Sequence, residues 1–188
     1  TLLASSAASD VYKRQGVKNA RVGLLNNGTE EHKGDPLHQQ TYQLLKKMDV
    51  INFAGNIEGR DIMLGDCDVA VCDGFSGNIA LKSIEGAAKL VLSVIKKEAT
   101  SSVSAKIGSL FLLKAFKRMR ASLDFEAVGG ALLLGVKKVV IKSHGSSKAR
   151  TITAAVNNAA NIYRGNLIGR VEEMLSKVDW DNLIPKEE

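Results

Sequence analysis

The stretch CDVAVCDGFSGN, residues 67–78, decides the fold of this chain. Its first half is an apolar run bounded by Asp and Gly, which is typical of a strand covered on both faces. Two glycines and a serine follow, and from Ser76 to Glu98 apolar residues recur about every 3.6 positions, which predicts a helix. A strand, a tight loop and a helix in this order form the repeating unit of a parallel α/β sheet.

The same unit occurs earlier in the chain. The apolar run ARVGLL stops at Asn-Asn-Gly and predicts a buried strand that begins at Arg21 and ends in a loop. Helical spacing over Leu37–Met48, with Pro36 in the first turn, precedes a second strand at Val50–Gly55. The repetition predicts an α/β fold of three α/β/α layers with a mostly parallel, doubly wound sheet.

The last third of the chain has a different pattern. Two short strands, Ala131–Gly135 and Val139–Gly145, are separated by too few residues for a helical crossover and predict a hairpin. A final helix is expected over Lys148–Val178, with an interruption near Gly165 or Gly169.

Composition indicates one globular domain. Of the 188 residues, 45% are hydrophobic and 24% are charged, which is ordinary for a folded protein. Residues Thr1–Gln15 are small, polar and patternless, so we set them apart as a disordered or foreign segment. Residues 16–188 are expected to form part of a single α/β domain.

The net charge of +6 at pH 7 predicts an anionic partner. Charge alone leaves nucleic acid, an acidic protein, a phosphate ligand and a membrane surface open. Aromatic residues make up only 5% of the chain and do not alternate with Arg or Lys along a strand, which argues against nucleic acid.

Cysteine usage and hydropathy predict a cytoplasmic protein. Cys67 and Cys72 are an odd number of positions apart on a predicted strand, so they should face opposite ways and form neither a disulfide nor a metal pair. No apolar run approaches the roughly 20 residues that cross a bilayer. No basic and apolar leader is recognisable either, so we expect neither a membrane span nor export.

Ligands of a doubly wound sheet bind where strands lead into helices, so we expect the chemistry in the loops after Leu25, Phe53 and Cys72. The first loop, NNGTEEHKGDP, combines flexible glycines with ionisable side chains. It is either a solvated surface loop or a loop whose backbone N–H groups hold an anion together with Lys33.

The loop DGFSGN is the sharper signal. Gly74 and Gly77 permit tight turns between a strand end and a helix start, which is how an anion site at a helix N-terminus is built. The alternative is a plain turn with Ser76 as N-cap. Asn78 replaces the last glycine of the nucleophile elbow G-x-S-x-G, so a serine hydrolase is disfavoured. Neither a dinucleotide fingerprint nor a P-loop occurs, and we expect no cofactor.

The segment SHGSSKAR after the predicted hairpin is a third candidate. It puts His144 at the end of a strand, before a helix with Ser146 or Ser147 as N-cap. A lone histidine is usually structural. His32, His38 and His144 lack the i, i+4 spacing of a helical metal pair, so we expect no metal.

Residues 100–121 form a basic amphipathic stretch without acidic residues. One interpretation is a helix in the headgroup plane of an anionic membrane, and the alternative is a helix packed on a partner subunit. The residues expected to face the membrane are Ile107, Leu110, Phe111, Leu112 and Phe116, and the basic residues are Lys106, Lys114, Lys117, Arg118 and Arg120.

Four motifs occur in a fixed order: VGLLNNGTEEHKGDPLHQQTYQLLK, INFAGNIEGRD, DVAVCDGFSGNIALKSIEGAAK and GGALLLGVKKVVIKSHGSSKA. From about Val22 to the final helix, the chain closely resembles the C-terminal half of the bacterial phosphate acyltransferase family of phospholipid synthesis. The resemblance implies a phosphotransacetylase-like fold, a homodimer and peripheral association with the membrane. It implies formation of acyl phosphate from acyl-acyl carrier protein and inorganic phosphate, and transfer of the product to a membrane glycerol-phosphate acyltransferase.

The N-terminal half of that family, which helps to form its cleft, has no counterpart in this sequence. Residues 16–188 then correspond to the C-terminal part of one phosphate acyltransferase domain. The positions that carry over are Lys33, Asn78 and the pair His144 and Gly145. The sequence does not indicate a preferred acyl chain length.

The reaction that the resemblance implies needs positioning more than base catalysis. Phosphate near neutral pH is already an anionic nucleophile, and the departing thiol has a pKa near 8.5. Donors aimed at the oxyanion supply the stabilisation. We assign the positive charge to Lys33, and protonation of the thiolate or a loop-holding role to His144. Phosphate or oxyanion contacts are assigned to Gly74, Ser76, Gly77 and Asn78.

Arg60 and Lys106 are candidates to contact the acidic carrier protein. Two alternatives remain at this stage. One is a phosphotransacetylase-like enzyme that uses acyl-coenzyme A, and the other is an inactive fragment that serves only as a membrane or protein interaction module.

Overall fold

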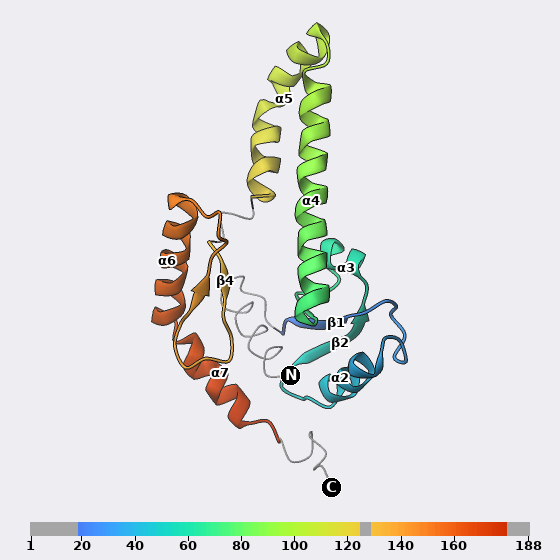
Figure 1. The fold of residues 1–188 in the computed structure, drawn as a ribbon, viewed down its shortest axis with the longest axis vertical. Coiled ribbons are helices and arrows are strands. Elements are labelled where there is room, and N and C mark those ends of the chain that lie inside the picture. Colours follow the sequence, from blue (N-terminus) through green and yellow to red (C-terminus); the bar gives the residue numbers. More distant parts are fainter. Residues whose placement is uncertain (1–18, 125–128, 180–188) are drawn as a thin grey trace.

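The computed structural model describes residues 19–124 and 129–179 of the chain. Strands alternate with helices in its first part, and helices dominate the rest (Figure 1). In chain order the elements are β1 (Arg21–Leu25), α2 (Pro36–Lys46), β2 (Asn52–Ile57), α3 (Gly59–Leu64), β3 (Val69–Val71), α4 (Gly74–Ala99), α5 (Val103–Ser122), β4 (Ala131–Leu132), β5 (Ile141–Lys142), α6 (Ala149–Arg164) and α7 (Leu167–Ser176). The segment Thr1–Gln15 lies outside the described residues.

β1 is the central strand of a three-stranded parallel sheet with the order β2-β1-β3. Leu24 of β1 lies opposite Asn56 in β2 and Val71 in β3. The predicted α/β class and parallel sheet are therefore confirmed, and the flanking helices are consistent with three α/β/α layers (Figure 1). Because the strands are parallel, their carboxyl ends meet at one edge of the sheet.

Two strands of the parallel sheet differ from their predicted bounds. β2 begins at Asn52 rather than Val50, because the chain before it turns and the Ile51 N–H donates to the carbonyl of Met48 at 3.4 Å. β3 is restricted to Val69–Val71, since only these residues pair with β1.

The core of the described chain lies between the sheet and α2. Val22 and Leu24 of β1 are 0% and 3% exposed, and Leu45 of α2 is 0% exposed. They form one cluster with Met48 and Val69. The apolar residues of β1 and the helical spacing of α2 thus meet in one packed layer.

α4 and α5 form a helical hairpin that projects away from the sheet (Figure 1). α4 confirms the predicted helix over Ser76–Glu98 and begins earlier, at Gly74, because Asp73 caps it. Neither helix contains a fully buried residue. The predicted protruding segment, residues 100–121, corresponds to α5. Over residues 19–124 and 129–179, no helix combines the length and apolar character that crossing a bilayer requires.

β4 and β5 confirm the predicted hairpin, since they pair in the antiparallel direction. Each strand has only two residues, fewer than predicted. The predicted final helix is two helices, α6 and α7, with the interruption at Gly165 as expected. Asn166 adopts the left-handed conformation, with φ of 48°, and redirects the chain there.

Leu45→Ala is expected to destabilise the chain, because Leu45 is fully buried in the core between α2 and the sheet. Truncating a buried leucine costs about 2–5 kcal/mol in the free energy of unfolding. Leu37→Ala is the matched control, since this leucine of the same helix is 59% exposed. It should cost less than about 0.5 kcal/mol. Urea unfolding measures both, and equal losses would contradict this placement of the core.

Candidate functional site

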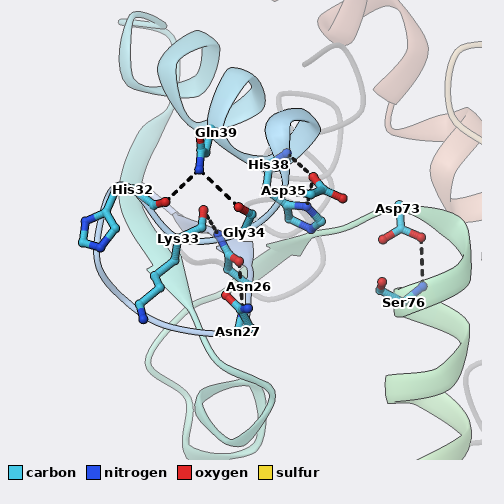
Figure 2. A network of polar contacts seen from close by, with 10 residues as sticks. All are labelled: Asn26, Asn27, His32, Lys33, Gly34, Asp35, His38, Gln39, Asp73 and Ser76. Atoms are coloured by element: carbon cyan, nitrogen blue, oxygen red, sulfur yellow. Dashed lines mark hydrogen bonds and ion pairs between the residues drawn. The ribbon is translucent and has the colours of Figure 1, made fainter.

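The loops after β1 and β3 leave the sheet from adjacent strands. The first loop, residues 26–35, leads into α2, and the second, residues 72–73, leads into α4 (Figure 2). We call these two loops, with the first turns of α2 and α4, the carboxyl-edge site. It contains Lys33 and Asn78, two of the predicted site residues.

Hydrogen bonds anchor the loop 26–35 to α2 (Figure 2). The Asn26 side chain donates to the carbonyl of Lys33 at 3.0 Å. The Gln39 side chain of α2 donates to the carbonyls of His32 at 2.8 Å and Gly34 at 3.2 Å. The loop is therefore internally bonded and held against the helix that follows it, although its outer side chains are in solvent.

Lys33, the predicted positive charge, extends from the outside of this loop. Its Nζ lies 3.9 Å from a carboxylate oxygen of Glu30, and 40% of the side chain is exposed. In Figure 2 the Lys33 side chain points away from Asp73 and Ser76 at the start of α4. The structure thus places Lys33 in the same site as α4 but does not direct its charge at the helix.

The N-terminus of α4 is capped by Asp73 and not by Ser76. The Asp73 carboxylate accepts the backbone N–H groups of Phe75 at 2.7 Å and Ser76 at 2.9 Å, and its carbonyl accepts that of Gly77 at 3.0 Å. Backbone donors that the sequence assigned to phosphate are therefore already bonded. The Asn78 side chain is exposed and has no hydrogen bond with other described residues.

The two glycines of this turn differ in what surrounds them. A Cβ on Gly77 would lie 2.5 Å from Cys72 Sγ, so glycine lets α4 start close to the end of β3. A Cβ on Gly74 would meet no atom within 4 Å. The side of the turn at Gly74 is therefore open to a ligand.

The charge of Asp73 affects what the α4 N-terminus can bind. Hydrogen bonds from the side chain and backbone of Ser76 lower the pKa of Asp73 below its ordinary value. An ionised carboxylate is also favoured there by the helix dipole. A second anion that approaches the same donors is repelled by this carboxylate.

The structure adds a pair that the sequence motifs did not indicate. Asp35, the N-cap of α2, accepts the His38 backbone N–H at 2.9 Å, and the same oxygen lies 2.7 Å from His38 Nδ1. In Figure 2 the pair lies on the side of α2 that faces Asp73. Hydrogen bonds from the side chain and the backbone of His38 lower the pKa of Asp35 below its ordinary value. The sequence feature that could have indicated this pair is an Asp-Pro helix start with a histidine in the first turn.

His144 lies outside the carboxyl-edge site. It follows β5 and lines a cleft of about 660 Å³ that is bounded by α4, α5, α6, the pair Gly129 and Gly130, and the residues that follow β5. We call this the α6 cleft. His144 Nδ1 accepts the Ser146 N–H at 3.2 Å, so the neutral ring carries its proton on Nε2. Among the described residues, no hydrogen bond or ion pair joins His144 to Lys33 or Asn78.

The two residues predicted to contact a carrier protein are in solvent on different helices. Arg60 of α3 is 74% exposed and lies 2.6 Å from a carboxylate oxygen of Glu58 and 3.6 Å from one of Asp61. Lys106 of α5 is exposed and has no ion pair within the described ranges.

Most residues expected to face a membrane are exposed on α5, while Phe116 is only half-buried. The exposed fractions are 55% for Ile107, 63% for Leu110, 85% for Phe111 and 52% for Leu112.

Both cysteines are free. Burial raises the pKa of the Cys67 and Cys72 thiols, which makes them poor nucleophiles at neutral pH. In the part of the chain that the structure describes, no group of three or more His, Cys, Asp or Glu side chains is arranged to hold a metal ion.

The comparison with known proteins gives a match over most of the chain. Residues 5–170 match the family model described as fatty acid synthesis protein. The chain belongs to this family. The match of the fatty acid synthesis protein family begins inside Thr1–Gln15 and includes both the carboxyl-edge site and His144.

Relatives in the fatty acid synthesis protein family are named phosphate acyltransferase. The chain is 45% identical over 174 residues to one from Mycoplasma capricolum, covering 92% of this chain and 52% of the relative. It is 46% identical over 166 residues to one from Clostridium perfringens strain SM101, covering 88% and 49%. It is 48% identical over 158 residues to one from Helicobacter hepaticus, covering 84% and 47%. The chain thus spans about half the length of these relatives.

Ser76→Ala is expected to raise the pKa of Asp73 toward its ordinary value of 3.8, because the Ser76 side chain is the largest cause of its lowering. With a lowered native pKa, the ionised group stabilises the fold above its unfolded value, and this stability is lost as the pH falls through the native pKa. In the Ser76→Ala variant, ionised Asp73 should therefore contribute less to the free energy of unfolding. NMR titration of the Asp73 carboxyl carbon measures the shift. Ser93→Ala, at an exposed position of α4, is the control and should leave it unchanged.

Proposed function

We propose that this chain is part of a cytoplasmic acyltransferase that forms acyl phosphate from acyl-acyl carrier protein and inorganic phosphate in phospholipid biosynthesis. The observation that carries the proposal is the similarity to phosphate acyltransferases, at 45–48% identity over 84–92% of the chain. Family membership supports the coarser function of acyl transfer in lipid synthesis. The carrier-protein donor and the phospholipid role are the finer parts of the proposal.

The reaction balances without a cofactor. An oxygen of hydrogen phosphate forms a bond to the thioester carbonyl carbon, the carbon–sulfur bond breaks, and the phosphate proton passes to the thiolate. The products are acyl phosphate and a free thiol. The barrier then depends on positioning the phosphate anion against the thioester carbon and on donors at the developing oxyanion, which typically lower it by about 3 kcal/mol each.

At the carboxyl-edge site, Asn78 and Lys33 are the groups we assign to this task. The Asn78 side chain is free to donate within the described residues, and the space beside Gly74 is open. The Lys33 ion pair with Glu30 is long, at 3.9 Å, and exposed, so turning the ammonium toward a bound phosphate costs little. Bound phosphate would compete with Asp73 for the first N–H groups of α4.

His144 has two roles that its geometry supports. Its Nε2–H is a donor suited to a leaving thiolate, while its Nδ1 contact with Ser146 holds the loop before α6. We favour the loop-holding role, because a thiolate with a pKa near 8.5 takes up the phosphate proton without a dedicated acid.

The carrier protein is expected to dock through basic side chains. Arg60 and Lys106 are exposed, and charge complementarity mainly increases the association rate. An acyl-coenzyme A donor is the alternative that the shared fold does not distinguish, so both donors belong in the test.

α5 presents an exposed apolar stripe that supports contact with a membrane. Val103, Ile107, Leu110 and Phe111 follow helical spacing and are 55–85% exposed. By the same spacing, the basic residues Lys114 and Arg118 fall within this stripe, as suits an anionic headgroup region. We propose peripheral membrane association, which would place the acyl phosphate near a membrane glycerol-phosphate acyltransferase. Homodimer formation through the same hairpin is the competing proposal.

The function is tested with the chain joined to the remaining half of the Mycoplasma capricolum relative. The unsubstituted hybrid should form acyl phosphate faster from acyl-acyl carrier protein than from acyl-coenzyme A. Lys33→Ala and Asn78→Ala should each lower the rate by at least about tenfold, because each removes a charge or donor from the transition state.

Lys47→Ala and Asn157→Ala are the matched controls, since both side chains are exposed outside the site. A folded hybrid that forms acyl phosphate from neither donor would contradict the proposed function. Wild-type rates in both site variants would contradict only the assignment of Lys33 and Asn78.

Flotation of the chain with anionic liposomes tests the membrane proposal. Phe111→Glu with Leu112→Glu should abolish flotation, because charged side chains replace exposed apolar ones on α5. Leu90→Glu with Val94→Glu, on the exposed surface of α4, is the control for a general charge effect. Unchanged flotation of the α5 variant, together with loss of a dimer, would favour the subunit interface instead.

A further inference from the structure

The α6 cleft has an excess of positive charge. Its two carboxylates are already paired, Glu85 with Lys82 at 2.8 Å and Asp124 with Arg150 at 2.8 Å. The pKa of Glu85 is lowered by Lys82 first, with smaller contributions from Lys89 and His144. Three further cations line the cleft and have no ion-pair partner among the described residues: Lys89, Lys117 and Arg120.

The N-terminus of α6 opens into this cleft without a side-chain cap. The N-cap is Lys148, and not Ser146 or Ser147 as predicted, and a lysine side chain carries no acceptor that could cap the helix. This long helix has no acidic residue in its first turn. Within the described ranges, the N–H groups of residues 149–151 have no acceptor. Such an end attracts an anion through its dipole and its free donors.

Two hydroxyl groups give an independent sign of a missing ligand. Thr151 is 7% exposed, and its Oγ1 is buried without a hydrogen-bond partner in the part of the chain that the structure describes. Ser147 Oγ is likewise buried and has no partner among these residues. Both residues line the α6 cleft. A buried hydroxyl without a partner costs stability unless a bound group uses it.

Two glycines of the cleft wall pack closely against the backbone of α6 and β5. A Cβ on Gly129 would collide with the backbone of Ala154 and Ala155 in α6. A Cβ on Gly130 would lie 2.5 Å from the carbonyl oxygen of Lys142 in β5. Both glycines have positive φ, 84° and 154°. The cleft is therefore shaped by backbone packing and does not depend on flexible side chains alone.

We propose that the α6 cleft binds a phosphoryl group, held by the free N–H groups of α6, the hydroxyls of Ser147 and Thr151, and the cations of α4 and α5. A phosphoryl group has the charge and the several acceptor oxygens that these donors require. Which molecule carries this phosphoryl group is inferred from the proposed function. Free inorganic phosphate, held apart from the carboxyl-edge site, and the phosphate of a phosphopantetheine arm share this chemistry.

Amide NMR of the ¹⁵N-labelled 188-residue chain tests the site. Inorganic phosphate and phosphopantetheine are titrated separately, each against chloride at matched ionic strength. The resonances of residues 149–151 should shift. Thr151→Val should weaken binding about tenfold, because a hydrogen bond to a charged group is lost. It should not lower the melting temperature, because Thr151 Oγ1 has no partner to lose.

Thr153→Val is the matched control, since the hydroxyl of this exposed residue in α6 donates to the carbonyl of Ala149 at 2.9 Å. Lys89→Gln should also weaken binding, whereas Lys97→Gln, farther along α4 and outside the cleft, should not. Shifts with inorganic phosphate identify a site for free phosphate, and shifts with phosphopantetheine alone identify a site for the arm. No shift with either probe, or equal weakening in both threonine variants, overturns the proposal.

The acyl phosphate assay separates this inference from the proposed function. Phosphoryl binding in the α6 cleft together with an inactive hybrid would contradict the proposed function and support the proposed binding site. An active hybrid that binds neither probe in the α6 cleft would contradict the proposed binding site and support the proposed function.

Discussion

The pairing of β1 with a parallel neighbour on each side is the constraint on which the carboxyl-edge site depends. At its start, the Arg21 backbone N–H and Nε both donate to Asp68 beside β3, at 2.7 and 3.1 Å. At its end, the Asn26 N–H donates to the carbonyl of Ile57 in β2 at 2.8 Å. Both ends of the strand are thereby attached to its neighbours. The loops after β1 and β3 consequently emerge together and bring the first turns of α2 and α4 into one site.

The N-termini of α2 and α4 differ from that of α6, and the difference bears on where anions bind. Asp35 and Asp73 cap α2 and α4 with carboxylates, which satisfy the first N–H groups and repel other anions. α6 begins after Lys148 without a side-chain cap, beside unpaired cations and the buried hydroxyl of Thr151. Physical chemistry therefore favours α6 over α4 as a resting anion site. An anion at α4 requires help from Lys33 or Asn78.

The projecting hairpin of α4 and α5 carries much of the exposed apolar surface of the described chain. Phe75 and Ile79 near the start of α4 are 77% and 50% exposed, and Phe111 on α5 is 85% exposed. Apolar surface of this extent marks an interaction with another protein, another subunit or a lipid surface. The relatives are about twice as long as this chain.

Sequence periodicity by itself determined the parallel strand and helix units, the long α4, the hairpin of β4 and β5 and the break at Gly165, because each depends on spacing and turn chemistry within a few residues. It also located Lys33 in the loop after β1 and Asn78 close to the end of β3, although Asn78 lies within α4. Only the tertiary structure decided that Asp73 occupies the first donors of α4 and that His144 lies in a separate cleft. The choice of Asp73 as the cap depends on side-chain direction, which the short pattern DGFSGN leaves open between Asp73 and Ser76. The place of His144 depends on how the start of α6 lies beside α4 and α5, which precede it by many residues and leave no local pattern.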